Sequence, residues 1–290
     1  MTDWLPTLDP YWEARQAALE AINKDRRNAN LPLVEWDQLA AQVADYHCQE
    51  MAGHGYIAHW NLRGLLPHHR YHFAGGGDHI AENSSRLTVI SSNPFPISAE
   101  PKQIRNYLIQ AHEGFMAEKP PIDLHRINVL DPSHTHVGIG FAVSGRELRM
   151  SQLFVNRYVK LAALPKELPI GAVRVEGEML RKDFGPYYCM LFSEGNPVAR
   201  TPQELNLTYS YSDTEGEEAG KVPPWDMEFS PQSGRFRFSI RIRNRQPGYY
   251  HLLIWVRNKV REIPYRLYPG VKAAADTKDA IPCAGWVFQA

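Results

Sequence analysis

The chain has 290 residues, of which 43% are hydrophobic and 22% are charged. This composition is that of a folded globular protein and excludes a wholly disordered chain, a collagen or a coiled coil. The 32 basic and 32 acidic residues cancel, so charge indicates no nucleic-acid-binding surface, and no stretch approaches the roughly 20 apolar residues of a transmembrane helix.

The first half of the sequence predicts helices mixed with strands. Asp9-Pro10 is a typical helix start, Asp37 is the expected N-cap of a second helix, and Gly55 helps to end that helix. A first helix is expected from residue 10 to the polar run at 23–30, and further helices at 38–51, 62–73 and 101–117. Two strands are expected at 137–143 and 147–158.

After residue 161 the sequence changes to short alternating segments separated by turn residues. Strands are expected at 172–180, 187–192, 205–211, 235–243, 249–256 and 286–289. This spacing is typical of an antiparallel β-sandwich. We therefore expect two domains, 1–160 and 171–290, joined by a linker at 161–170 that contains Pro165 and Pro169.

Cysteine usage gives little sign of a disulfide framework or a cysteine metal site. The three cysteines, Cys48, Cys189 and Cys283, are scattered and form no C-x-x-C pair. One bridge between Cys189 and Cys283 stays open, but three buried thiols are the preferred interpretation. The start of the chain shows no basic segment followed by an apolar one, the pattern of a signal peptide.

Histidine is concentrated in the first half, where 11 of the 12 precede residue 137. Any chemistry is therefore expected there. The sequence has no nucleophile elbow, phosphate-binding loop or dinucleotide-binding motif. An H-E-x-x-H zinc motif starting at His112 fails because Met116 occupies its last position.

Four residues in loops and at helix ends form the candidate site: His59, Glu82, Glu118 and His125, here called the His/Glu tetrad. Imidazoles and carboxylates bind Zn²⁺ and other first-row ions, and they also serve as general bases and acids. The simpler alternatives are hydrogen-bonding histidines, a turn cap at Glu82 and an ordinary helix-end acid at Glu118. A helix C-terminus disfavours a carboxylate by roughly 0.3–1 kcal/mol, which favours a functional reason for Glu118.

The remaining histidines are interpreted as non-ligands. Five are expected to be polar loop residues around the cleft: His54, His68, His69, His72 and His79. His134 and His136 are expected at the surface. Gly138 and Gly140 are expected to let their strand pack closely against a neighbour.

The motifs, in this order, resemble the CAP superfamily of cysteine-rich secretory proteins, antigen 5 and pathogenesis-related 1 proteins and their bacterial relatives. The run N-K-D-R-R-N-A-N-L-P-L-V-E-W-D is similar to the family's opening motif. A-E-N at 81–83 matches its G-E-N with Ala for Gly, and A-E-K-P at 117–120 matches its s-E-k-P. H-R-I-N-V-L-D-P and V-G-I-G-F-A complete the pattern, so that the resemblance covers residues 10–158.

The resemblance implies an α+β protein with an N-terminal CAP-type α-β-α sandwich, which we expect to be followed by an immunoglobulin-like β-sandwich. It further implies a cleft in which His59 and His125 hold a divalent metal, with zinc the expected ion. Glu82 and Glu118 would bind that ion through water or act as catalytic bases. The groups implied to orient these residues are Arg70, Asn83 and Asn128.

The function that we expect is metal-assisted hydrolysis of a peptide or ester by a secreted or extracytoplasmic protein. The alternative is a non-enzymatic module that binds a lipid, glycan or protein, and a third interpretation makes the tetrad purely structural. A cytoplasmic location is the alternative to secretion. The expected partner is a small ligand, lipid, glycan or peptide, and no nucleic acid. The resemblance does not choose among these partners, because a fold alone does not determine a function.

The second half contains one further pattern that could bind a partner. Five arginines share one parity in the segment 235–245: Arg235, Arg237, Arg241, Arg243 and Arg245. A strand would place them on one face and the intervening apolar residues in the core. The preferred interpretation is a solvated face paired with acids on neighbouring strands, and the alternative is a surface for an anionic or glycan partner.

Overall fold

The computed structural model describes residues 9–89, 96–212, 214, 216–258 and 280–290, which form two compact units. The first unit contains the chain up to Leu62 together with Ala81–Val155 and Arg200–Ser210. The second contains Arg63–Ile80, Asn156–Ala199 and the chain from Tyr211 onward. Each unit therefore includes a short segment whose neighbours in sequence belong to the other unit.

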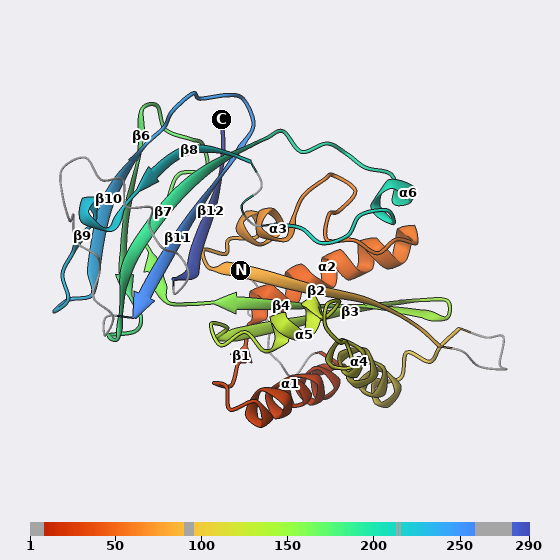
Figure 1. Cartoon of the computed structure of the whole chain (residues 1–290). Coiled ribbons are helices and arrows are strands. Elements are labelled where there is room, and N and C mark those ends of the chain that lie inside the picture. Colours follow the sequence, from red (N-terminus) through yellow and green to blue (C-terminus); the bar gives the residue numbers. More distant parts are fainter. Residues whose placement is uncertain (1–8, 90–95, 213, 215, 259–279) are drawn as a thin grey trace. The chain divides into compact units, whose positions relative to one another are not determined.

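The first unit is a four-stranded sheet with helices on both faces (Figure 1). Its helices are α1 (Trp12–Asn28), α2 (Gln38–His54), α4 (Pro101–Met116), α5 (Leu124–Val129) and α6 (Pro202–Leu205). Its strands are β1 (Glu35–Trp36), β2 (His79–Thr88), β3 (His136–Ser144) and β4 (Glu147–Asn156), in the order β1-β3-β4-β2. Strands β3 and β4 pair antiparallel, and β1 pairs parallel with β3.

Alternation along β3 explains the three layers of this unit. Ile139 joins a buried apolar cluster with Ile22 of α1 and Leu108 of α4. The residues of opposite parity, Gly138 and Gly140, face the backbone of α2, where a Cβ atom would overlap Ala41 and Asp45. The expected close packing at these two glycines is thus confirmed, and so is the α-β-α sandwich.

Among its described residues, the second unit has two four-stranded antiparallel sheets and one short helix (Figure 1). The first sheet, in the order β5-β6-β10-β9, contains β5 (Val159–Leu161), β6 (Ala172–Met179), β9 (Glu228–Phe229) and β10 (Arg235–Arg241). The second, in the order β12-β11-β7-β8, contains β7 (Phe184–Gly195), β8 (Glu217–Val222), β11 (Tyr249–Asn258) and β12 (Ile281–Gln289). The helix is α3 (Pro67–Phe73), and a 3₁₀ turn follows β8 at Pro224–Asp226.

The strand order of the second unit is that of an immunoglobulin fold. When the eight strands are lettered A, B, C, C′, D, E, F and G in chain order, the sheets are A-B-E-D and G-F-C-C′. A shared apolar core includes Val175 and Ile240 from one sheet and Leu191 and Ile254 from the other. The predicted immunoglobulin-like sandwich is confirmed.

A tyrosine corner adds a second mark of that fold. The hydroxyl of Tyr250, near the start of β11, accepts from the backbone N–H of Gln246 over 2.7 Å. The same hydroxyl donates to the carbonyl oxygen of Gln246 over 3.1 Å. Immunoglobulin-type sandwiches use this bond to hold the corner that precedes strand F.

The strand predicted at 205–211 is wrong. Thr201 and Glu204 form a reciprocal capping box that starts helix α6 instead. Leu205 is fully buried in an apolar cluster of the first unit with Cys48 and Met51. The strand that follows β7 in sequence is β8, at Glu217–Val222.

The structure also describes the expected linker segment and the three cysteines. The segment expected as a linker, 161–170, belongs to the second unit, where the Leu168 N–H donates to the carbonyl oxygen of Gln289 over 2.8 Å. The three cysteines are buried thiols that are not bonded to one another, as preferred, and burial raises their pKa values well above the ordinary range. None of the described helices has the length and apolarity required to cross a membrane.

Candidate functional site

His59 and Glu82 of the tetrad form one pair within the first unit. Helix α2 ends at Gly55, which adopts the left-handed conformation with φ of 74°, and His59 lies in the loop that follows. Its Nδ1 is 2.9 Å from Oε1 of Glu82 on β2, whose side chain is 1% exposed. The other carboxylate oxygen of Glu82 accepts from the hydroxyl of Ser151 over 3.0 Å.

Side chains from neighbouring elements hold the backbone just before His59. Arg149 of β4 donates to the carbonyl oxygen of Tyr56 over 2.9 Å. His47 of α2 bonds through Nε2 to the carbonyl oxygen of Ala58 over 2.8 Å. The loop therefore presents His59 from a fixed position.

His125 and Glu118 form the second pair. Nδ1 of His125 is 2.5 Å from Oε1 of Glu118, and its ring stacks on Phe115 with centroids 4.6 Å apart. The second oxygen of Glu118 accepts from the backbone N–H groups of His125 and Arg126 over 3.1 and 3.4 Å. Glu118 follows the end of α4, but it caps the start of α5. The structure thus supplies a local reason for a carboxylate at this position.

A chain of hydrogen bonds connects the second pair to a buried histidine. Asn83 donates from Nδ2 to the carbonyl oxygen of His125 over 3.0 Å, and Asn128 donates to Oδ1 of Asn83 over 2.8 Å. Nε2 of His134 is 2.9 Å from Oδ1 of Asn128. The expectation that His134 lies at the surface is wrong, because it is 2% exposed and stacks on Phe154.

The tetrad is thus arranged as two His–Glu pairs. Each imidazole gives Nδ1 to a carboxylate, which is how metal-binding histidines are commonly oriented. No three tetrad residues bring their ligand atoms within 4.8 Å of one another, and all four lie in the described part of the chain. Arg70, implied as an orienting group, belongs to the second unit, where it donates to the carbonyl oxygen of Leu65 over 3.0 Å.

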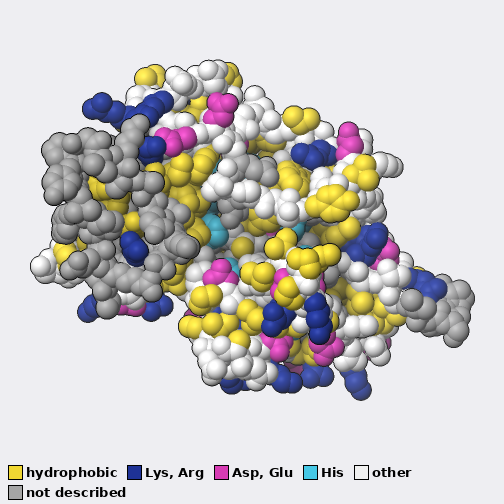
Figure 2. Space-filling model, viewed as in Figure 1, with side chains coloured by type: hydrophobic (Ala, Val, Ile, Leu, Met, Phe, Trp, Pro, Cys, Tyr) yellow, Lys and Arg dark blue, Asp and Glu magenta, His cyan; other side chains and the backbone are white. Residues whose placement is uncertain are grey.

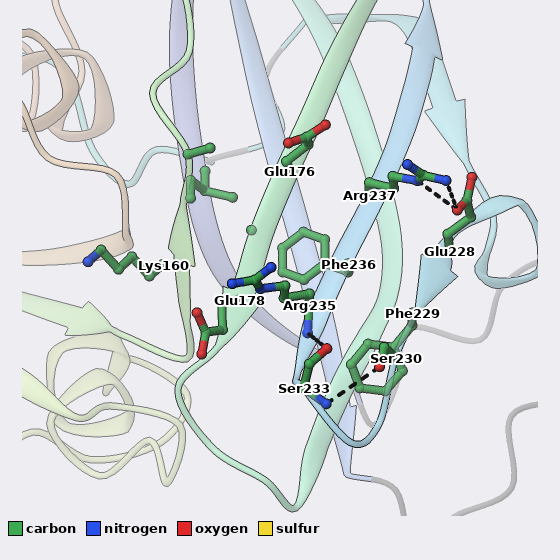
Figure 3. Close-up of a pocket in the computed structure, with 13 residues that line it drawn as sticks. Lys160, Glu176, Glu178, Glu228, Phe229, Ser230, Ser233, Arg235, Phe236 and Arg237 are labelled. Carbon is green, nitrogen blue, oxygen red and sulfur yellow. Dashed lines mark hydrogen bonds and ion pairs between the residues drawn. The ribbon is translucent and has the colours of Figure 1, made fainter.

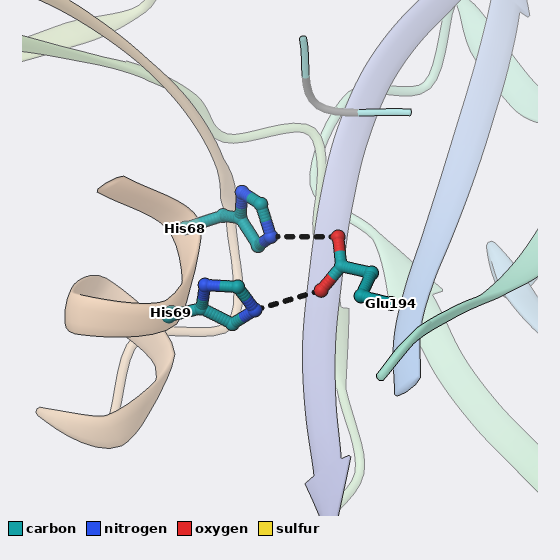
Figure 4. A group of neighbouring side chains, drawn as sticks. All are labelled: His68, His69 and Glu194. Carbon is teal, nitrogen blue, oxygen red and sulfur yellow. Dashed lines mark hydrogen bonds and ion pairs between the residues drawn. The ribbon is translucent and has the colours of Figure 1, made fainter. Parts of the chain in front are cut away.

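A second His/Glu group lies in the other unit (Figure 4). Nε2 of His68 is 3.0 Å from one oxygen of Glu194, and Nε2 of His69 is 2.7 Å from the other. Within the described residues, these three form the group whose ligand atoms lie within 4.8 Å of one another, and they could hold a metal ion. The two histidines are not loop residues as expected, because they lie buried on α3.

Two further buried imidazoles lie close to this group. His251 of β11 stacks on His68 with ring centroids 4.2 Å apart, and its Nδ1 is 3.9 Å from the nearer oxygen of Glu194. Burial lowers the pKa of His251 well below its usual value and that of His72 to about 4. His79 is also buried, at the start of β2, and His54 is exposed at the end of α2, so neither is a loop residue as expected.

One signal in the sequence bears on this second group. Histidine is dense in the segment 68–79, but this segment was expected to surround the cleft of the first domain. Glu194 stands in a Glu-Gly-Asn-Pro run that indicates only a turn. Its partners come from a segment more than a hundred residues away, so no local pattern connects them.

Two of the five arginines, Arg235 and Arg237 on β10, have acids opposite them on the neighbouring strands, as the preferred interpretation expected, whereas Arg241 lies opposite Ala172. Exposed and buried residues alternate along the strand, and Arg237 forms an ion pair with Glu228 of β9 over 2.6 Å. The register places Arg235 opposite Glu178 of β6. These residues line an open cavity of about 700 Å³ (Figure 3). On the face shown in Figure 2, basic and acidic side chains are likewise interspersed.

Comparison with known proteins identifies the first unit. A family model described as the cysteine-rich secretory protein family, CAP, matches residues 19–156. No curated protein matches the chain. The family model matches the segment that carries the sequence motifs.

Two solved structures are similar to about half of the chain. One is an extracellular protein containing an SCP domain from Bacillus anthracis, with 23% identity and a TM-score of 0.35 over 50% of this chain and 41% of that one. The other is an outer surface protein from Borrelia burgdorferi, with 17% identity and a TM-score of 0.38 over 50% of this chain and 93% of that one. The chain therefore spans less than half the length of the Bacillus protein. From the family match and the sequence motifs, residues 19–156 of this protein are a CAP domain.

Proposed function

We propose that the CAP domain binds a divalent metal ion, with zinc the expected ion, through the imidazoles of His59 and His125. The observation that carries this proposal is the bond from Nδ1 of each imidazole to a carboxylate. Such a bond sets the orientation and tautomer of a histidine that binds a metal through Nε2.

The donor set fits an open site rather than a closed one. A structural zinc site gathers four protein ligands around the ion, whereas the tetrad residues are paired and not clustered within 4.8 Å. The paired arrangement of the tetrad agrees better with an ion that is held by two imidazoles and has its other coordination positions open to water or a ligand. The side chain of His125 is 34% exposed, so a ligand can reach it from solvent.

Hydrolysis of a peptide or ester is the reaction that we propose for such a site. A divalent ion bound there would polarise a carbonyl group and lower the pKa of a bound water. Glu82 and Glu118 hold the two rings in place through Nδ1, which leaves Nε2 of each ring for the ion. The carboxylates of Glu82 and Glu118 are the groups that would accept a proton from that water.

A non-enzymatic binding module is the second candidate, and two observations favour it. All four carboxylate oxygens of the tetrad already accept a hydrogen bond, so neither acid is an uncommitted base. In addition, Ile122, Leu124 and Ile127 near His125 are 79%, 61% and 55% exposed. Three exposed aliphatic residues in such a short segment suit an apolar ligand or a protein partner.

We also infer an extracytoplasmic location. The family that matches residues 19–156 is one of secretory proteins. Cell fractionation of the source organism with an antibody against the chain tests this inference, which recovery in the cytoplasmic fraction would contradict.

Calorimetric zinc titration of the chelator-stripped protein tests the metal site. Because the second unit contains its own His/Glu group, the titration uses the His68→Ala/His69→Ala background. We expect binding at micromolar or tighter concentration, lost when His59→Ala and His125→Ala are added while the circular dichroism stays native. Unchanged zinc binding after that addition would contradict the proposal.

Activity measurements then separate the two candidate functions. With a panel of peptides and chromogenic esters, a hydrolase must lose turnover when Glu82 or Glu118 is replaced by Gln. If the zinc-loaded protein turns over no substrate but retains an apolar ligand, the binding module is correct.

A further inference from the structure

We propose that the second unit contains a divalent-metal site of its own, formed by Nε2 of His68, Nε2 of His69 and the carboxylate of Glu194. All three residues belong to that unit, and none belongs to the tetrad of the CAP domain. The ligand set is two imidazoles and one carboxylate, which suits zinc or another first-row divalent ion.

The donor atoms lie within 4.8 Å of one another, so that a shift of a few tenths of an ångström would let them hold one ion. Zinc lies about 2.0–2.2 Å from nitrogen and oxygen ligands, so tetrahedral ligands stand roughly 3.3–3.6 Å apart. The two nitrogens lie 3.0 and 2.7 Å from the oxygens of Glu194, and Figure 4 shows both rings pointing toward that carboxylate. Nδ1 of His251 lies 3.9 Å from one oxygen of Glu194, outside the group of three.

The negative charge of the Glu194 carboxylate also favours a bound cation. Its side chain is 7% exposed, and the described groups within 4 Å of its oxygens that could carry positive charge are three imidazoles. No arginine or lysine of the described residues forms an ion pair with it. A buried carboxylate is costly unless a cation compensates it. A metal ion would supply that charge and use the imidazoles as neutral ligands.

The site also lies on rigid elements. His68 and His69 are on α3, which starts with Pro67 at its first position, and Glu194 is on β7 in the middle of the second sheet. Helices and strands hold ligands more precisely than loops do. A preformed geometry of this kind lowers the ordering cost of binding an ion.

One contact predicts how binding changes the protein. The N–H of Leu66 donates to Nδ1 of His69 over 3.1 Å, so in the metal-free chain the ring hydrogen lies on Nε2 and points at Glu194. An ion bound at Nε2 would require the other tautomer, in which the single ring hydrogen is on Nδ1, and Nδ1 could then no longer accept from Leu66. Metal binding should therefore accelerate hydrogen exchange at the Leu66 amide.

Cobalt and zinc titrations of the full chain test the proposal. They use the His59→Ala/His125→Ala variant, so that the CAP pair cannot contribute. We expect one equivalent of cobalt with visible d–d absorption, which zinc displaces. The Glu194→Gln variant keeps the shape of the side chain and removes its charge, and should weaken binding by more than about 100-fold, beyond the usual effect of losing an orienting partner. His69→Ala should do the same.

Control variants keep this test separate from that of the CAP site. His54→Ala replaces an exposed histidine and should leave cobalt binding unchanged. If the folded His59→Ala/His125→Ala protein binds no metal, or binds it equally well after Glu194→Gln, the proposal is wrong and the group is a carboxylate held by two imidazole N–H donors. That result would not contradict the proposed metal site of the CAP domain, because that site is titrated in the His68→Ala/His69→Ala variant.

Discussion

The side-chain amide of Asn83 donates to the main-chain carbonyl oxygen of His125 over 3.0 Å, which connects β2 to the start of α5. Asn83 is in turn held by Asn128, and Asn128 by the buried His134. Because the bond reaches the backbone of His125, the position of its ring depends on a residue that does not touch the ring itself.

Asn83→Ala should therefore weaken zinc binding at the CAP pair by about 10- to 100-fold, the usual effect of removing an orienting partner. Calorimetry in the His68→Ala/His69→Ala background measures it, with circular dichroism to verify the fold. Asn106→Ala, an exposed change on α4, is the matched control and should have no effect. Equal affinities for the two variants would show that the Asn83 bond is not needed to position His125.

Gly138→Ala should destabilise the CAP domain strongly. The added Cβ would overlap Ala40 and Ala41 of α2, and backbone atoms cannot move aside as a flexible side chain can. We expect a loss of about 1–3 kcal/mol or more in urea unfolding. The control is Gly114→Ala in α4, where no atom lies within 4 Å of the new Cβ and the change should stabilise the helix by up to about 1 kcal/mol. Similar midpoints for the two variants would contradict the packing described for β3 and α2.

Tyr250→Phe should destabilise the immunoglobulin-like unit by about 1–3 kcal/mol. The change removes one hydroxyl and leaves the N–H and the carbonyl group of Gln246 without their partner. Urea unfolding, monitored by fluorescence, measures the loss. Tyr209 is 86% exposed, so Tyr209→Phe should change the midpoint little. If Tyr250→Phe leaves the urea midpoint unchanged, the tyrosine corner does not stabilise the sandwich.

Acid should destabilise the second unit through His72. Burial lowers the pKa of this histidine in the folded protein to about 4, from an ordinary value near 6.5. Below pH 6.5 the unfolded chain binds a proton that the folded chain does not, so the free energy of unfolding falls as pH decreases from 6.5 to about 4. The shift corresponds to about 3 kcal/mol over that range.

Urea midpoints at pH 7.5 and pH 5 measure this effect. His72→Gln should reduce the loss of stability between the two values, whereas the exposed His54→Gln should leave it as in the wild type. If the urea midpoint falls by the same amount between pH 7.5 and pH 5 in all three proteins, His72 does not cause the loss of stability in acid.

The CAP domain could be predicted from the sequence because its evidence is local. The A-E-N and A-E-K-P motifs, the helix caps and the two glycines of β3 each occupy a few consecutive residues, and the family model matches the same region. The immunoglobulin-like sandwich followed from alternation, since residues on the two faces of a strand repeat every second position. These patterns involve residues that are close together in the sequence, so they can be recognised without knowing which strands pair.

The strand predicted at 205–211 shows where local patterns fail. Its apolar residues are compatible with a strand, but the capping box at Thr201 and Glu204 starts a helix, and Leu205 is buried among residues of the first unit. Contacts between distant segments decided its structure, as tertiary packing often overrides propensity.

The sequence by itself determined which residue types lie in the tetrad segments and which two folds the chain adopts. Only the tertiary structure decided that Glu118 caps α5, that His134 is buried, and that Glu194 bonds both His68 and His69. The physical reason is that a side chain's partners depend on strand register and helix placement. These bring residues more than a hundred positions apart into hydrogen-bonding distance, and no short pattern records such proximity.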